Sequence, residues 1–171
     1  MGKKVFVFLL ILFAVSTVFC NWNLEYSKEK MFGEKKWYVA SSKVLPAKGH
    51  TFSQQDLATK MLITYDPKTK KHNVILYFPS YIILKGGVKY GNYYLYLTCV
   101  RWDNETEVLA MYGEALIDTI VFDDPEHIIK KMRSSKTMIL ELYLITGETA
   151  YFGFDLTGVS NAIDKLHAKY K

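Results

Sequence analysis

Apolar and polar residues alternate with a period of two through much of the chain that follows residue 21. Alternation over four to eight residues, bounded by Gly, Pro, Asn or Asp, is typical of half-buried β-strands. The clearest case is residues 137–156, where two alternating runs flank Gly147-Glu148 and predict a β-hairpin. Further strands are predicted near residues 22–26, 37–45, 61–65, 74–78, 88–102, 108–112 and 117–122.

Two segments depart from the strand pattern and predict helices. Asp124-Pro125-Glu126 supplies a capping residue, a first-turn proline and an early acid ahead of an apolar run. Near the C-terminus, apolar residues recur at spacings of three and four between 159 and 166, and Thr157 is the expected cap. We therefore expect one mainly β domain over residues 21–171, an antiparallel β-sandwich with a short internal helix and a C-terminal helix.

Tyrosines are concentrated in the longest predicted strand, residues 88–102, where Gly91 indicates a bulge or a bend. In a regular strand Tyr90, Tyr94 and Tyr96 share one face. Tyrosine also suits any half-buried sheet surface, but an exposed row offers rigid apolar area and hydroxyl groups to a protein or a glycan. Tyr90, Tyr94 and Tyr96 are therefore the candidate binding residues, with Tyr94 and Tyr96 as the expected exposed pair.

Residues 1–20 have the layout of a secretory signal peptide. Lys3 and Lys4 precede an uncharged apolar run that ends at Phe19 and is short for a membrane span. The expected outcome is cleavage and export to the periplasm or the medium. Two alternatives stay open: an uncleaved anchor, and a lipoprotein acylated at Cys20, although bulky Phe19 does not suit a lipid-attachment signal.

Composition indicates a globular chain without strong attraction to nucleic acid. Half of the 171 residues are hydrophobic, 23% are charged, and the net charge is +5, with lysines scattered in small groups. After cleavage, Cys99 has no intramolecular partner, so the fold cannot depend on a disulfide. Cys99 is expected to be a buried, inert thiol, and a disulfide-linked dimer is the alternative.

No catalytic or metal-binding motif appears in the sequence. The four histidines lie far apart, and the chain contains no CxxC, HExxH or GxSxG pattern. The acids around Asp124 are explained by helix capping. We assign no catalytic residue, metal ligand or cofactor. A small hydrolase assembled from distant strands is the less favoured alternative, and a nucleophile bonded to His72 or His127 in a deep pocket would support it.

The C-terminal third resembles a known family. Its features are a helix over 124–132, a strand over 136–145, a turn at Gly147, and Phe-Asp-Leu-Thr-Gly at 154–158 leading into a helix. This block resembles the VasI/TagO family of type VI secretion accessory proteins and, more loosely, the invasion-associated locus B proteins. Tyr65 stands where those proteins tend to have a cysteine, which departs from the family's disulfide. The resemblance implies an exported, β-rich accessory domain and supplies no catalytic residues.

These observations favour an exported, non-enzymatic envelope or secreted domain that acts by binding another protein. A glycan- or ligand-binding module is the main alternative. Nucleic acid is not an expected partner. A membrane is an expected partner only if the leader is retained or Cys20 is acylated. The sequence does not indicate the oligomeric state.

Overall fold

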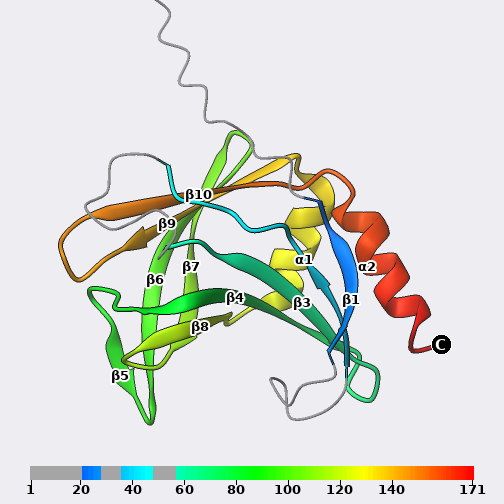
Figure 1. The fold of residues 1–171 in the computed structure, drawn as a ribbon, viewed down its shortest axis with the longest axis horizontal. Coiled ribbons are helices and arrows are strands. Elements are labelled where there is room, and N and C mark those ends of the chain that lie inside the picture. The colour runs from blue at the N-terminus through cyan, green and yellow to red at the C-terminus, as the bar shows by residue number, and fades with distance from the viewer. Residues whose placement is uncertain (1–20, 28–35, 48–56) are drawn as a thin grey trace, which may run out of the picture.

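The computed structural model describes residues 21–27, 36–47 and 57–171. The predicted signal peptide, residues 1–20, lies outside the described residues. The described residues form ten strands and two helices (Figure 1). The strands are β1 (Asn23–Ser27), β2 (Lys36–Ala40), β3 (Lys60–Asp66), β4 (Lys71–Ile82), β5 (Val88–Tyr90), β6 (Tyr93–Trp102), β7 (Glu105–Gly113), β8 (Ile117–Phe122), β9 (Thr137–Tyr143) and β10 (Thr149–Asp155). The helices are α1 (Pro125–Ser134) and α2 (Val159–Ala168).

All ten strands belong to one antiparallel sheet with the order β1-β2-β3-β4-β8-β7-β6-β9-β10, and β5 pairs with β6. The sheet curls until its two ends meet. The Trp22 Nε1–H donates to the Asp155 carbonyl at 2.8 Å, and the Ala47 N–H donates to the Tyr151 carbonyl at 3.0 Å. The predicted mainly β, sandwich-like fold with an internal and a C-terminal helix is confirmed, and its layers come from a single folded sheet.

The core fills the inner face of this curled sheet. Phe78 of β4 and Phe152 of β10 meet edge to face across it, with ring centroids 6.1 Å apart. Both helices bury an apolar stripe against the same core, as their spacing of three and four predicts. The stripe of α1 is Ile128, Ile129 and Met132, and that of α2 is Val159, Ala162, Ile163 and Leu166. Neither helix has the length and apolar character that crossing a bilayer would require.

The two helix starts differ. The Asp124 carboxylate accepts a hydrogen bond from the His127 N–H at 3.0 Å, and Pro125 opens the helix, as predicted. The expected cap of α2 at Thr157 is wrong. Gly158 occupies the capping position with a φ of +84° and makes no side-chain cap bond. The chain turns from β10 into α2 through this left-handed residue, which a glycine adopts without steric cost.

The long strand predicted over residues 88–102 is two strands. Gly91 has a φ of +62°, and the chain reverses at Gly91-Asn92. β5 therefore folds back along β6, pairing Val88 with Leu95 and Tyr90 with Tyr93. Gly91 marks the tip of a hairpin, where a positive φ is required, rather than a bulge within a strand.

Candidate binding surface

The outer face of β5, β6 and β7 carries a continuous set of exposed apolar side chains, which we call the outer apolar face. Register places its members next to one another: Val88 beside Leu95, Tyr90 beside Tyr93, and Leu95 beside Tyr112. The exposed fraction of Tyr90 is 72% and that of Leu97 is 63%. The members with large exposure are Val88, Tyr90, Tyr93, Leu97 and Val108.

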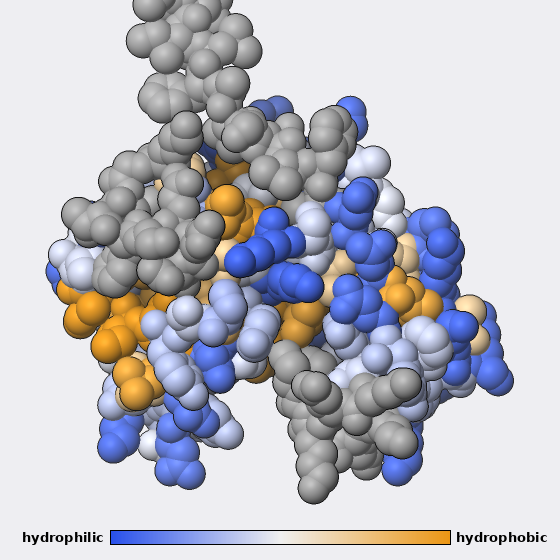
Figure 2. Space-filling view, in the orientation of Figure 1, coloured by the Kyte–Doolittle hydropathy of each residue, from blue (hydrophilic) through white to orange (hydrophobic). Residues whose placement is uncertain are grey.

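Figure 2 shows apolar residues gathering at the left of the molecule, over β5 and the adjoining ends of β4 and β9. The backbones of β4 and β9 meet there, because the Ile145 N–H donates to the Ile83 carbonyl at 3.0 Å. Both isoleucines are exposed. Exposed apolar groups that cluster, rather than occur singly, are characteristic of interaction surfaces.

The structure keeps one predicted binding residue on this surface and removes another. Tyr90 is exposed, Tyr94 is half-buried, and Tyr96 retains only 4% of its exposure. The expectation that Tyr94 and Tyr96 form the exposed pair is therefore wrong. Tyr96 points into the core, where its ring packs so closely on Gly87 that a Cβ at residue 87 would lie 2.5 Å from Cε1.

The error has a physical origin. Along β6 both alternating sets are apolar or aromatic, so the pattern alone does not say which set faces the core. The hairpin at Gly91 also moves Tyr90 onto the face of Tyr93 and Leu97, opposite to Tyr94 and Tyr96. Tyr93 and Leu97 were the residues that sequence reasoning missed. The turn residues Gly91-Asn92 were the available signal.

Cys99 follows Leu97 on the same face and is half-buried, so the expectation of a buried thiol is wrong. Among the described residues it forms no disulfide. Glu141 and Tyr143 of β9 lie beside it. Removal from water, together with the Glu141 carboxylate and the Cys99 thiol, raises the pKa of Tyr143 to about 12. The Tyr143 hydroxyl therefore stays protonated and donates to the carboxylate.

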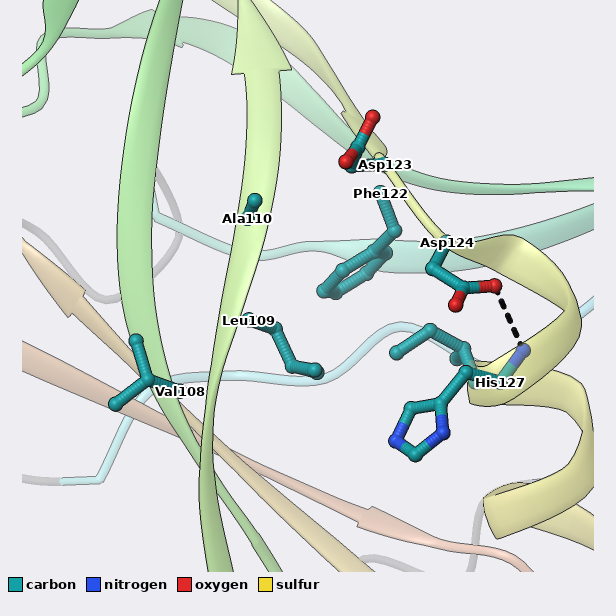
Figure 3. Close-up of a pocket in the computed structure, with 8 residues that line it drawn as sticks. Val108, Leu109, Ala110, Phe122, Asp123, Asp124 and His127 are labelled. Atoms are coloured by element: carbon teal, nitrogen blue, oxygen red, sulfur yellow. Dashed lines mark hydrogen bonds between the residues drawn. The ribbon is translucent and has the colours of Figure 1, made fainter.

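A cleft separates β7 from the start of α1 (Figure 3). Its volume is about 320 Å³. Leu109, Phe122 and His127 project into it, and the carboxylates of Asp123 and Asp124 stand at its upper rim in this view. The cleft thus combines apolar walls with a negative edge.

Comparisons with protein-family models, curated proteins and solved structures find no match to this chain.

The fold brings together two histidines that are far apart in sequence. His72 of β4 faces His167 of α2, with their Nε2 atoms 2.8 Å apart. Glu126 of α1 accepts from the His72 backbone N–H at 2.8 Å and lies 2.8 Å from its Nδ1. If neutral His72 donates through Nδ1 to this carboxylate, its Nε2 is an acceptor and His167 supplies the proton between the rings. We call these three residues the histidine clasp.

The pKa shifts of His167 and Glu126 agree with the hydrogen bonds of the clasp. Burial lowers the pKa of His167, and the adjacent His72 lowers it further. Burial alone would raise the pKa of Glu126, but the hydrogen bonds from the His72 backbone and ring bring it below its ordinary value. The arrangement therefore favours an ionised Glu126 and a neutral His167. Tyr65 covers both rings, with centroids 5.1 Å from His72 and 4.6 Å from His167.

Within the described residues, both ring nitrogens of His72 and the Nε2 of His127 are hydrogen-bonded to a carboxylate or to another histidine. His72 is bonded to Glu126 and His167, while His127 Nε2 lies 2.8 Å from a Glu107 carboxylate oxygen. His50 lies outside the described residues. Within residues 21–27, 36–47 and 57–171, no three His, Cys, Asp or Glu side chains are grouped to hold a metal ion. The observation that would have favoured a hydrolase is not met at either histidine.

Proposed function

We propose that this chain is an exported, non-enzymatic accessory domain that binds another protein through its outer apolar face. The observation that carries the proposal is the exposure of neighbouring large apolar residues on β5, β6 and β7. A partner that covered this patch would gain about 25 cal/mol of binding free energy for each Å² of apolar surface removed from water. Tyrosine flanked by aliphatic side chains is also the composition found at the centres of protein interfaces.

A protein is a better fit than a glycan because of the aliphatic share of this face. Val88, Leu97 and Val108 are exposed beside the tyrosines. Sugars need polar groups placed around an aromatic platform, whereas branched aliphatic side chains complement apolar protein surface. The resemblance of residues 121–166 to exported accessory proteins supports the same proposal.

The test is recovery of a partner by native purification from the envelope or secreted fraction of the source cells. The baits are the wild-type chain and a Tyr93→Ser, Leu97→Ser double variant. Tyr26→Ser serves as the matched control, because Tyr26 is an exposed aromatic residue of β1, at the far end of the sheet order. The expected result is one partner retained by the wild type and by Tyr26→Ser, and lost by the double variant.

Three results would overturn the proposal. The first is equal recovery of the partner by the double variant. The second is specific binding on a glycan array that the double variant abolishes, which would make the face a sugar site. The third is a wild-type dimer in size-exclusion chromatography that the double variant dissolves, which would mean that a second copy covers the face.

A further inference from the structure

β7 has an open edge along its first half. It pairs with β6 over its whole length, from Glu105 to Gly113. On its other side it pairs with β8 only from Met111 onward. Within the described residues, the last backbone contact on that side is the Asp123 N–H donating to the Ala110 carbonyl at 3.0 Å. Among the residues that the structure describes, no strand therefore lies beside residues 105–109 on the side of α1.

The backbone groups on this edge can be assigned from the register. Consecutive residues of an antiparallel strand direct their N–H and C=O groups to opposite sides. Because the Ala110 carbonyl points to the open side, the backbone N–H and C=O groups of Val108 and Thr106 point to that side as well. These two residues offer two donors and two acceptors in the geometry of a sheet edge.

Two side chains of α1 reach this edge: Lys131 Nζ lies 2.6 Å from a Glu105 carboxylate oxygen, and His127 Nε2 lies 2.8 Å from one of Glu107. The strand residues themselves lack the usual protection against strand addition. Natural edge strands are guarded by lysine, proline, a bulge or a covering element. Residues 106–110, Thr-Glu-Val-Leu-Ala, contain neither lysine nor proline, and Val108 is exposed. The one charged side chain among them, Glu107, is held by the Trp102 Nε1–H and by His127.

The cleft lies directly beside this edge and would receive side chains from an added strand. A residue opposite Leu109 would point to the inner side, between Leu109, Phe122 and Ile128. A residue opposite Val108 would join the outer apolar face. The Asp124 carboxylate caps α1 through the His127 N–H, and the Asp123 carboxylate accepts from the Tyr112 hydroxyl. Both line the cleft, and their negative charge favours a cationic residue in the same segment.

We propose that the edge of β7 binds an extended segment of the partner protein, which adds to the sheet as a strand. The segment carries apolar residues at alternate positions and a lysine or arginine that faces Asp123 and Asp124. This inference rests on the proposed function in assuming a protein partner. It goes further in naming the binding mode, in which backbone hydrogen bonds supply affinity and the cleft supplies selectivity.

The experiment uses a random heptapeptide phage library selected on the purified chain. The informative bait pair is Val108→Pro and Val108→Thr. Both change the side chain, but only proline removes the N–H at the open edge, and it leaves the bonds to β6 intact because Val108 does not donate in that direction. The expected result is a consensus of alternating apolar residues with a cation, retained by Val108→Thr and weakened about tenfold by Val108→Pro.

A synthetic peptide of the consensus sequence then locates the site. Amide hydrogen exchange at Thr106 and Val108 should slow when this peptide binds the wild-type chain. Asp123→Lys should remove the preference for a cation and select acidic residues in its place. This variant keeps the proposal testable if Val108→Pro does not fold, because Asp123 is exposed and lies outside the ladders of β7 and β8.

The outcomes separate this proposal from the proposed function. Leu97→Ser changes the outer apolar face but not the edge, so it should select the same consensus as the wild type. Equal peptide binding by Val108→Pro, no consensus, or protection that misses Thr106 and Val108 would overturn strand addition and leave the outer-face proposal standing. Protection of the edge without peptide, rising with protein concentration, would assign the edge to a second copy and also overturn it.

Discussion

Two leucines illustrate how differently the two sides of this sheet meet their surroundings. Leu166 of α2 is fully buried in the common core, whereas Leu97 of β6 keeps 63% of its exposure on the outer apolar face. Beneath the helices, apolar area is covered within the chain and contributes to folding. On the outer face of β5–β7, comparable side chains remain in water. The same residue type therefore serves stability on one side and is available to a partner on the other.

Polar groups also differ between the core beneath the helices and the exposed sheet surface. The histidine clasp joins β4, α1 and α2 with each buried polar atom matched to a partner. At the open edge of β7, Thr106 and Val108 have no strand partner within the described residues. Because unmatched groups are tolerated only where water reaches them, the contrast separates a region in which the buried polar side chains are paired from an edge whose backbone groups are open to a partner.

The largest expected effect is a loss of stability in the core beneath α2. Leu166→Ala should lower the free energy of unfolding by about 2–5 kcal/mol, since it leaves a cavity beneath α2. Leu97→Ala should change it by less than about 0.5 kcal/mol. Urea titration of both variants measures the difference, and equal losses would show that the two leucines are not in different environments.

A second variant tests the boundary between the two sides. Gly87→Ala places a methyl group against the buried ring of Tyr96 and should cost about 1–3 kcal/mol of unfolding free energy. Tyr96→Ala removes the obstructing ring. In a double-mutant cycle, the cost of Gly87→Ala should therefore largely disappear in the Tyr96→Ala background. Persistence of the full cost would contradict the packing of Tyr96 on Gly87.

The histidine clasp should make stability fall under mildly acidic conditions. The pKa of His167 lies below its ordinary value of 6.5 in the folded chain, so the unfolded chain binds more protons once the pH drops below that value. The contribution is complete above about pH 6.5 and is lost as the pH falls toward the folded pKa. The lowered pKa of Glu126 adds a further loss below its ordinary value of 4.5.

The measurement is the free energy of unfolding against pH for the wild type and His167→Gln. Glutamine does not titrate, so the variant curve should be flatter between pH 7 and pH 5 even if the variant is less stable throughout. Parallel curves would mean that His167 titrates alike in the folded and unfolded chains.

The smallest effect concerns Cys99 on the outer apolar face. A half-buried thiol should react with iodoacetamide in the native protein, more slowly than in the unfolded chain. Bound partner should slow the reaction by about threefold, because the thiol lies beside Leu97 on the covered face. Mass spectrometry of the Cys99 peptide reports the rate, and Cys99→Ser is the control. An unchanged rate would place the partner elsewhere.

Local signals predicted most of the fold. The Asp124-Pro125 start of α1, the 137–156 hairpin and the apolar stripe of α2 each depend on neighbouring residues, and each is present. The candidate site was predicted less well. Tyr90 is exposed, but it lies on the opposite face from Tyr94 and Tyr96, with which it was predicted to share a surface. Tyr96 is buried, because the choice between the two faces of β6 depends on what packs against them.

The sequence by itself determined the strand and helix types, most of their approximate bounds and the turn at Gly147, since these follow from backbone preferences and short-range alternation. Gly91 indicated an irregularity, but the pattern did not predict that the chain reverses there. Only the tertiary structure decided which face of β6 is buried, that His72 meets His167 and Glu126, and that β8 pairs with only the second half of β7. Each of these depends on residues brought together by the curling of one sheet. No short-range pattern encodes that curvature, because it arises from packing of the entire core.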